Sequence, residues 1–475
     1  MTLVAGIDSS TQSCKVIIRE VETGEVVREG RASHPDGSEV HPDHWWDAML
    51  AAIEDAGGLD DVAAVSVGAQ QHGMVLLDED GQVVREALLW NDTRTHEQVD
   101  RLTAELGGPE QWVDQVGLVL AVSFTITKVA WVRDNEPDNA DRVAAVCLPH
   151  DWLTWRLKGY GPGSANFDEL TTDRSDASGT GYWSAAAGEY RPELLRMALG
   201  FVPALPRVVG PTERAGVTGE GIDGVPAGLP IGAGAGDNAA AALALGLEPG
   251  DAVMSLGTSG TIYARVSEPV RDVTGAMAGF ADATGDHLPL GATLNAARDL
   301  DALGKLLGKD HAQIGELALG APAGADGLTL LGYFEGERTP HLPEARASLH
   351  GMKLSNFTPE HLARATVEGM LASQVVMLRA LQRLDVPVER LFVIGGAAKN
   401  AAVQQILPSL VDVPVLVPAD GEYVALGASV QAAAALTGEF PAWPRQAQEL
   451  PQQPTDETVM NQHEAAKQAL GYPAG

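Results

Sequence analysis

Aliphatic and β-branched runs separated by short polar turns open the chain. The stretches "LVAGIDSS" (3–10), "CKVIIREVE" (14–22) and "VVREGRAS" (26–33) are three such runs, and the turn-like "TGE" separates the last two. This pattern predicts three strands joined in a meander. A strand, a turn of glycine and hydroxyl residues, and a second strand recur in "DAVMSLGTSGTIYARV" (251–266). The recurrence predicts an internal duplication, with one copy in each half of the chain.

The segments that follow each meander alternate between helical and extended patterns. Apolar residues recur at helical spacing in "HWWDAMLAAIEDAG" (44–57) and in residues 358–384, where Thr358 marks the predicted start. "DVAAVSVGAQQ" (61–71) and "RLFVIGGAAKN" (390–400) instead predict short buried strands that run into polar or glycine-rich turns. Strands that alternate with helices in this way predict an α/β protein with mixed sheets.

The length of the chain indicates two domains. It has 475 residues, and single hydrophobic cores stop growing at roughly 250–300 residues. We expect the boundary just before the second meander, which gives an N-terminal domain at 1–247 and a C-terminal domain at 248–475. After about Phe440 the chain becomes richer in proline and glutamine, and we expect this tail to be peripheral.

The charge and the cysteine count narrow the class of function. A net charge of −32 disfavours nucleic acid and anionic membrane surfaces as partners. Any phosphate must therefore be held by local groups together with a cation. Cys14 and Cys147 form neither a disulfide framework nor a zinc site. With no basic segment before the first apolar residues and no run long enough to span a bilayer, we expect a cytoplasmic protein.

Three turns combine small residues with groups that can bind an anion. They are "DSSTQSCK" (8–15), "SLGTSGT" (255–261) and "GGAAKN" (395–400). Turn N–H groups and hydroxyls can converge on a phosphate, although each turn alone is also compatible with a plain hairpin. Three such turns in one chain favour phosphate binding. The Walker A pattern is absent, because neither Lys305 nor Lys309 has the required upstream glycine.

A single carboxylate stands out in "IGAGAGDNAAAALALG" (231–246), where Asp237 is the only charged residue. It could cap the alanine-rich helix that follows, or it could accept a proton from a substrate. Gly234, Gly236 and Ala239 nearly complete a dinucleotide-binding fingerprint. We disfavour that interpretation, because Asp237 would set a carboxylate against the pyrophosphate.

Two long signatures carry a resemblance to a known family. "SFTITKVAWVRDN" (123–135) and "ASLHGMKLSNFTPEHLARATVE" (347–368) are joined by shorter matches such as "SDASGT", "GDNAAAALALG", "SLGTSG" and "GERTPH". In this order they resemble the FGGY carbohydrate kinases, from Met1 to about Leu436. The resemblance implies a two-domain actin- and hexokinase-like fold (ribonuclease H-like, with duplicated halves), and MgATP bound in a cleft between the domains.

The resemblance also implies roles for individual residues. Asp8 would hold the Mg²⁺ of ATP, and Asp237 would accept the proton of the sugar hydroxyl; both are the expected catalytic residues. The expected sugar contacts are Gln71, His72, Asp176, Asp237 and Asn238. The expected phosphate and adenosine contacts are Thr11, Ser13, Lys15, Gly257, Thr258, Ser259, Gly395, Gly396 and Asn400. The sugar site and the first phosphate turn would thus lie in the N-terminal domain, and the second phosphate turn and the adenosine site in the C-terminal domain.

Three positions depart from the pattern of the family. Ser10 and Ala397 stand where family members often have glycine, and Gln71 stands where members that phosphorylate D-xylulose usually have methionine. Serine is less comfortable than glycine at positive φ, so we expect the first phosphate turn to differ slightly. A polar Gln71 could add a hydroxyl contact or change which pentulose fits.

The leading expectation is ATP-dependent phosphorylation of D-xylulose to D-xylulose 5-phosphate, with ATP and Mg²⁺ as cofactors. Another ketose or polyol, such as ribulose, glycerol or gluconate, is an alternative that the departure at Gln71 keeps open. A chaperone-like ATPase or a sugar-sensing repressor belongs to a different class, and the repressor is disfavoured because the acidic chain shows no basic helix-turn-helix segment. Members of the family often form homodimers, and the sequence leaves the oligomeric state open.

Overall fold

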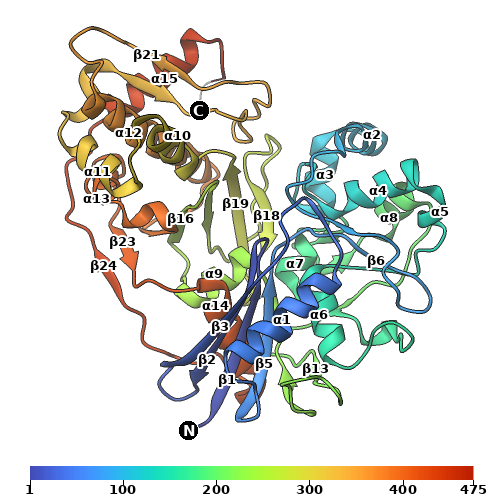
Figure 1. The fold of residues 1–475 in the computed structure, drawn as a ribbon. Helices are drawn as coiled ribbons and strands as arrows, with labels where there is room; N and C mark the ends of the chain where they lie inside the picture. The colour runs from blue at the N-terminus through green and yellow to red at the C-terminus, as the bar shows by residue number, and fades with distance from the viewer. Residues whose placement is uncertain (474–475) are drawn as a thin grey trace. The chain divides into compact units, whose positions relative to one another are not determined.

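The computed structural model describes residues 1–473, and the chain forms two compact units (Figure 1). The first unit comprises Met1–Gly246, Gly279–Leu288 and Asp420–Arg445. The second comprises Leu247–Ala278, Pro289–Ala419 and the chain from Gln446 onward. A change of unit thus falls between residues 246 and 247, one residue before the single boundary expected from the sequence, and two later segments return to the first unit.

The first unit is built on a mixed sheet whose strand order is β13-β14-β5-β1-β2-β3, with β15 also paired to β5. Strands β1 to β3 form the predicted antiparallel meander, and β5 runs parallel to β1. The strands are β1 (Leu3–Ser9), β2 (Ser13–Glu20), β3 (Val26–Ser33), β5 (Val62–Ala69), β13 (Gly216–Val217), β14 (Pro230–Ile231) and β15 (Ala235–Gly236).

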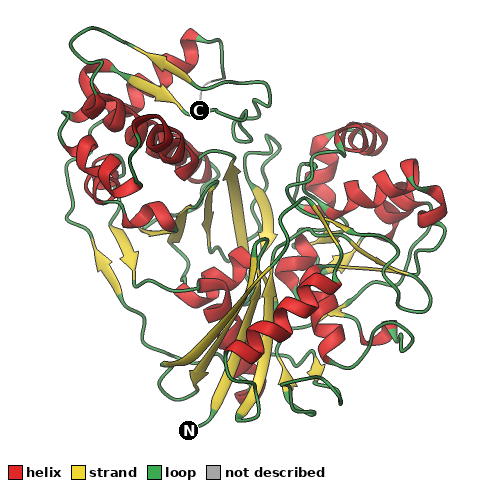
Figure 2. Cartoon of the chain, in the orientation of Figure 1, coloured by secondary structure: helices red, strands yellow, loops and turns green. Residues whose placement is uncertain are grey.

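Helices cover this sheet and complete the core of the first unit (Figure 2). Helix α14 (Tyr423–Thr437) packs on β1 and β5, and it approaches β1 so closely that a Cβ on Gly6 would lie 2.0 Å from the carbonyl oxygen of Ala425. Helix α1 (Asp43–Asp55) packs on β2 and β3 and buries Trp45 completely. The indole of Trp45 lies edge-on to that of Trp152, with ring centroids 6.5 Å apart.

Smaller elements surround the sheet of the first unit. The helices are α2 (His96–Leu106), α3 (Pro109–Val116), α4 (Thr125–Asn135), α5 (Pro137–Ala140), α6 (Pro149–Leu157), α7 (Arg174–Ser178), α8 (Pro192–Leu199) and α9 (Asp237–Leu245). The short strands are β4 (Glu39–Val40), β6 (Val75–Leu77), β7 (Ala87–Leu88), β8 (Ala145–Cys147), β9 (Thr171–Thr172), β10 (Trp183–Ser184), β11 (Glu189–Tyr190) and β12 (Arg207–Val208).

The second unit is also built on a mixed sheet, whose strand order is β18-β19-β17-β16-β22-β23-β24, where β18 is Ala278–Ala281. Strand β16 pairs antiparallel with β17 and parallel with β22, just as β1 pairs antiparallel with β2 and parallel with β5. The shared topology supports the predicted duplication. The strands are β16 (Asp251–Leu256), β17 (Gly260–Ala264), β19 (His287–Thr293), β22 (Arg390–Ile394), β23 (Val415–Pro418) and β24 (Ala447–Glu449); β20 (Thr329–Leu331) and β21 (Ser348–His350) form a separate pair.

The predicted long helix of the second unit is α12 (Pro359–Gln382), which begins as expected after Thr358, whose hydroxyl accepts a hydrogen bond from the N–H of His361. Its apolar residues form the centre of the core of this unit. The other helices are α10 (Ala297–Leu307), α11 (His311–Leu319), α13 (Ala401–Ile406) and α15 (Thr458–Ala469). Within residues 1–473, none of the helices combines the length and the apolar character needed to cross a membrane.

The expectation that the tail after Phe440 is peripheral is wrong. Strand β24 pairs with β23, and Leu450, Val459 and Met460 belong to the core of the second unit. Composition misled the prediction here, because most of the prolines and glutamines in this segment are exposed while a few apolar residues supply the contacts.

Candidate active site

The carboxyl ends of three parallel strands meet at one edge of the sheet in the first unit. Ser9 at the end of β1 pairs with Ala69 at the end of β5, and Gly236 at the end of β15 pairs with the same Ala69. The turn after β1, the residues after β5 and the start of α9 therefore lie together. This edge, where ligands bind in many α/β proteins, gathers Asp8, Gln71 and Asp237.

Asp237 is the first residue of α9 and does not cap it. The N-cap position is Gly236, and the helix has no side-chain cap, so the helix-capping interpretation is wrong. One carboxylate oxygen of Asp237, Oδ1, accepts hydrogen bonds from the backbone N–H of Asn238 at 2.7 Å and from its side-chain amide at 2.8 Å. Burial, with a smaller contribution from the Asp8 carboxylate, raises the pKa of Asp237 to about 6 against these hydrogen bonds.

Asp8 lies at the end of β1 with 1% of its surface exposed. Burial raises the pKa of its carboxyl, and the Lys15 ammonium and the Ser10 hydroxyl oppose that rise. The Ser10 hydroxyl donates to the Asp8 carboxylate at 2.6 Å. Ser10 does not adopt a positive φ, so serine fits this turn without the strain that the departure from glycine suggested.

Lys15 lies between two carboxylates. Its ammonium is 3.5 Å from Asp8 and 2.7 Å from Glu422, the residue before α14. Burial lowers the pKa of Lys15, but Asp8 and Glu422 outweigh that effect and raise it. The sequence analysis missed Glu422, which lies 407 residues away in the chain.

The other two predicted phosphate contacts of the first turn differ in exposure. Thr11 is half-buried, and its hydroxyl accepts a hydrogen bond from the indole of Trp90 at 3.0 Å. Ser13 is buried, and its carbonyl accepts the N–H of Ser10 at 3.0 Å, which closes the turn. The Thr11 hydroxyl is thus the more accessible of the two.

Gln71 and His72, the second and third residues after β5, have different surroundings. His72 adopts φ of 69°, a left-handed conformation that is uncommon for residues other than glycine and is found at functional sites. Its ring lies against Phe124 and Phe280, with centroids 5.2 and 5.7 Å away, and its Nδ1 is 2.8 Å from the carbonyl oxygen of Gly179. Gln71 is buried, and its side-chain amide donates to the carbonyl of Ser175 at 3.1 Å.

Asp176, an expected sugar contact, is completely buried. Its carboxylate lies 2.6 Å from Nδ1 of His150, which is equally buried, and Asp151 lies 3.4 Å from Nε2 of the same ring. Burial alone would lower the pKa of His150, but Asp151 and Asp176 raise it to about 10. The three residues are spaced closely enough to bind a metal ion, but a protonated imidazole bridging two carboxylates accounts for the 2.6 Å contact as a hydrogen bond.

The second unit brings its two glycine turns to one edge of its sheet. Ser255 of β16 pairs with Ile394 of β22, so the turn at 257–259 lies beside Gly395. Gly395 has φ of 92°, and a Cβ there would lie 2.7 Å from the backbone of Leu256. The carbonyls of Gly257 and Thr258 accept hydrogen bonds from residues at the start of α10, which anchors the turn.

Two of the predicted adenosine contacts, Gly396 and Asn400, differ in how exposed they are to a ligand. Gly396 is exposed, and open space surrounds its Cα. Asn400 is buried, its side-chain amide donates to the carbonyl of His311 at 2.6 Å, and its side-chain oxygen accepts the N–H of Ala402 at 2.9 Å. Both functions of Asn400 are therefore used within the second unit, and its predicted ligand contact rests on the resemblance alone.

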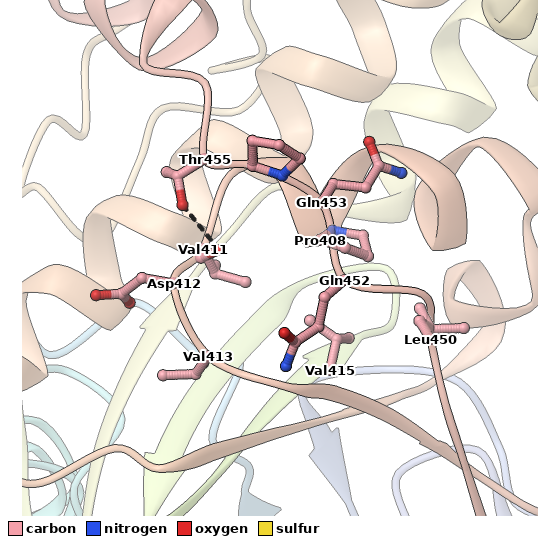
Figure 3. Close-up of a pocket in the computed structure, with 10 residues that line it drawn as sticks. Pro408, Val411, Asp412, Val413, Val415, Leu450, Gln452, Gln453 and Thr455 are labelled. Carbon is pink, nitrogen blue, oxygen red and sulfur yellow. Dashed lines mark hydrogen bonds between the residues drawn. The ribbon is translucent and has the colours of Figure 1, made fainter.

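A pocket of about 230 Å³ lies elsewhere in the second unit (Figure 3). It is lined by Pro408, Val411, Asp412, Val413, Val415, Leu450, Gln452, Gln453, Pro454 and Thr455. None of the predicted site residues lines it, and Asp412 is the single ionisable residue in that lining. Because pockets for charged substrates need converging polar groups, we do not regard it as the active site.

Known proteins match the chain over most of its length. Residues 3–244 match the N-terminal domain of the FGGY family of carbohydrate kinases, and residues 252–436 match its C-terminal domain. The xylulose kinase of Streptomyces coelicolor is 46% identical over 447 residues, which are 92% of this chain and 89% of that protein. The xylulose kinase of Streptomyces rubiginosus is 45% identical over 449 residues, 93% of this chain and 89% of that protein.

The fold is also found among solved structures. The crystal structure of the xylulose kinase from Bifidobacterium adolescentis superposes with a TM-score of 0.90 at 46% identity, covering 98% of this chain and 99% of that one. This match confirms the predicted two-domain fold class.

Proposed function

We propose that this chain, which belongs to the FGGY family of carbohydrate kinases, transfers the γ-phosphoryl group of ATP to the terminal hydroxyl of D-xylulose. The product is D-xylulose 5-phosphate. Two relatives at 45–46% identity and one solved structure at 46% carry the name xylulose kinase, which supports this sugar over the polyols and other ketoses.

The observation that carries the proposal is the raised pKa of the Asp237 carboxyl. Phosphoryl transfer requires mainly positioning and charge neutralisation, but the attacking hydroxyl must lose its proton. A general base works best when its pKa lies near the working pH, and burial raises the pKa of Asp237 to about 6. Asn238 holds Oδ1 of the carboxylate, so Oδ2 is left to accept the sugar proton.

Asp8 has the character expected of a residue that holds a metal ion. It is a buried carboxylate whose pKa is raised by burial, with a serine hydroxyl and a lysine 3.5 Å away as its neighbours. Mg²⁺ prefers one or two carboxylates together with phosphate oxygens, and this oxygen site fits that preference. When bound, Mg²⁺ neutralises negative charge on the phosphates of ATP.

Polar groups at the two glycine turns are proposed to hold the nucleotide. In the first unit these are the Lys15 ammonium, the Thr11 hydroxyl and the turn that ends at Ser13. In the second unit they are Gly257, Thr258 and Ser259 for phosphate, with Gly395, Gly396 and Asn400 for adenosine. Exposure of the Thr258 and Gly396 backbone supports close approach of a ligand.

His72 is proposed to contact the sugar. The neighbouring carbonyl of Gly179 and the Phe124 and Phe280 rings hold its imidazole in one orientation. A rigid polar group of this kind discriminates between hydroxyl patterns, because a missing partner leaves it unpaired.

The experiment is a measurement of ADP release with MgATP against D-xylulose, D-ribulose, glycerol and gluconate, with the phosphorylated product identified by mass and NMR. We expect the highest kcat/KM for D-xylulose and phosphorylation at its terminal hydroxyl. A higher kcat/KM for any other acceptor would refute the proposed substrate. ATP hydrolysis that no acceptor stimulates would refute the proposed kinase activity.

A further inference from the structure

The peptide between Ala235 and Gly236, just before Asp237 in the chain, is held by a side chain from another element. The backbone N–H of Gly236 donates to the hydroxyl oxygen of Ser175 at 3.0 Å. Ser175 belongs to α7 and is completely buried. A buried N–H without a partner is costly, so this hydroxyl fixes the orientation of the Gly236 peptide at the start of α9.

The Ser175 hydroxyl is itself oriented. It donates its hydrogen to Oδ2 of Asp173 at 2.6 Å, and the same carboxylate caps α7 by accepting the N–H of Ser175 at 2.7 Å and of Asp176 at 3.0 Å. Because the hydroxyl hydrogen is committed to Asp173, the oxygen presents its lone pairs to Gly236. The Asp173 carboxylate thus sets the direction in which the Ser175 hydroxyl faces the N–H of Gly236.

Two glutamines contact the same segment, residues 234–236, at other points. The side chain of Gln71 lies over Gly236, where a Cβ would approach its Cγ to 2.5 Å, and it donates to the carbonyl of Ser175. The side-chain amide of Gln431 on α14 donates to the carbonyl of Gly234 at 2.6 Å. The segment that leads into Asp237 is therefore held at more than one point, and Ser175 is the group that accepts the N–H of Gly236, the residue before Asp237.

We propose that Ser175 is a positioning residue for phosphoryl transfer, acting through the Gly236 peptide to hold the Asp237 carboxylate in its reactive orientation. This inference rests on the proposed role of Asp237 as the base. Ser175 has no exposed surface, and its hydroxyl bonds to Asp173 and Gly236. A displacement of a reacting group by about 1 Å can cost roughly 100-fold in rate, so loss of this hydroxyl is expected to lower kcat and not substrate affinity.

The test compares Ser175→Ala with Ser178→Ala in the full chain. Ser178 lies on the same helix, is equally buried, donates to the carbonyl of Ser175 at 2.7 Å and accepts the N–H of Ala281 at 3.0 Å. Each substitution removes one buried hydroxyl with one donated and one accepted side-chain hydrogen bond, so the two should lower Tm alike. We expect Ser175→Ala to lower kcat by roughly 10–100-fold with both KM values within about threefold, and Ser178→Ala to change kcat by less than about threefold.

Equal losses of kcat in the two variants would overturn the proposal, as would a rise in the KM of the sugar that accounts for the loss in Ser175→Ala. Should Ser175→Ala fail to fold, Ser175→Cys decides, because sulfur fills the place of the oxygen but is a weak acceptor. A kcat within threefold of wild type then overturns the proposal.

Asp237→Asn is measured in parallel. If it turns over normally, the proposed base is wrong; if it is inactive while Ser175→Ala matches Ser178→Ala, only the positioning role is wrong.

Discussion

The hairpin of β1 and β2 and the hairpin of β16 and β17 share a topology but differ in charge. In the first, the pair one step before the turn is Asp8 and Lys15; in the second, the corresponding pair is Ser255 and Thr261. In each hairpin the first strand lies between its antiparallel partner and a parallel strand, which is β5 for β1 and β22 for β16. The two hairpins thus share a backbone arrangement, while the first carries a carboxylate and an ammonium at this pair and the second carries two hydroxyls.

The largest expected effect comes from neutralising Asp237, whose pKa the charged hairpin helps to raise through Asp8. Asp237→Asn should lower kcat by at least about 100-fold while sugar still binds, as measured by steady-state kinetics and calorimetry. Asp60→Asn, which removes an exposed carboxylate of the same unit, is the control and should be close to wild type. Near-normal turnover of Asp237→Asn would contradict the assigned base.

The same variant should not be less stable than wild type at pH 8. The folded protein raises the pKa of Asp237 from 3.8 to about 6, so the folded state binds the proton more tightly and loses stability as the pH rises through that window. Asparagine resembles the protonated acid and avoids that loss, which has an upper limit of about 3 kcal/mol. Thermal melting at pH 8 measures it, and a clearly lower Tm would show that the carboxylate is structural.

Asp8→Asn removes the charge from the first hairpin itself. We expect Mg²⁺-dependent turnover to fall roughly 10–100-fold, the range found when a partner of a metal site is lost. The affinity for sugar, measured calorimetrically without nucleotide, should stay within about threefold. Loss of sugar binding along with turnover would mean that Asp8 maintains the structure of the turn and does not anchor the metal.

The pH dependence of kcat/KM offers a further test of the roles of Asp237 and Asp8. Because a protonated carboxyl cannot accept the hydroxyl proton, kcat/KM should fall below a pH near 6, by about tenfold for each further pH unit. Asp8→Asn should move this limb to lower pH, since the Asp8 charge contributes to the raised pKa of Asp237. A flat profile down to pH 5 in a protein that remains folded would contradict the assignment.

The smallest effect is expected from placing a charge in the uncharged hairpin. Ser255→Asp should raise the KM for MgATP by about fivefold or more, because two like charges about 4 Å apart repel by at least roughly 1 kcal/mol even in water. The KM for sugar should stay within twofold, and the neutral Ser255→Asn serves as the control. An unchanged KM for MgATP would indicate that the second hairpin does not approach the phosphates.

Sequence reasoning predicted elements better than contacts. The meander, the strand at 390–394 and the helix after Thr358 were all recognisable, because their apolar periods are local properties of the chain. The tail after Phe440 was misjudged, because a few apolar residues in a polar segment suffice for packing. The roles of the site residues stay predictions, and Asp176 and Asn400 turn out to be buried in hydrogen bonds of their own.

The long-range contacts of three groups left no local signal. Ser175 lies in the matched stretch "SDASGT", where no role was expected for it, and His150 and Glu422 lie in none of the quoted motifs. Each contacts a residue distant in sequence: Gly236, Asp176 and Lys15 respectively. A sequence can show that a carboxylate stands alone in an apolar segment, as Asp237 does. It does not show which hydroxyl orients the neighbouring peptide.

By itself, then, the sequence determined the order of strands and helices, the duplicated meanders and the family, because periodicity and long signatures are written along the chain. Only the tertiary structure decided that the ends of β1, β5 and β15 meet, that Asp237 stands one residue inside its helix, and that its pKa rises to about 6. Strand pairing joins Ser9 to Ala69, 60 positions apart, and Ala69 to Gly236, 167 positions apart. Burial, which shifts the pKa of a carboxyl, arises only when those segments exclude water together.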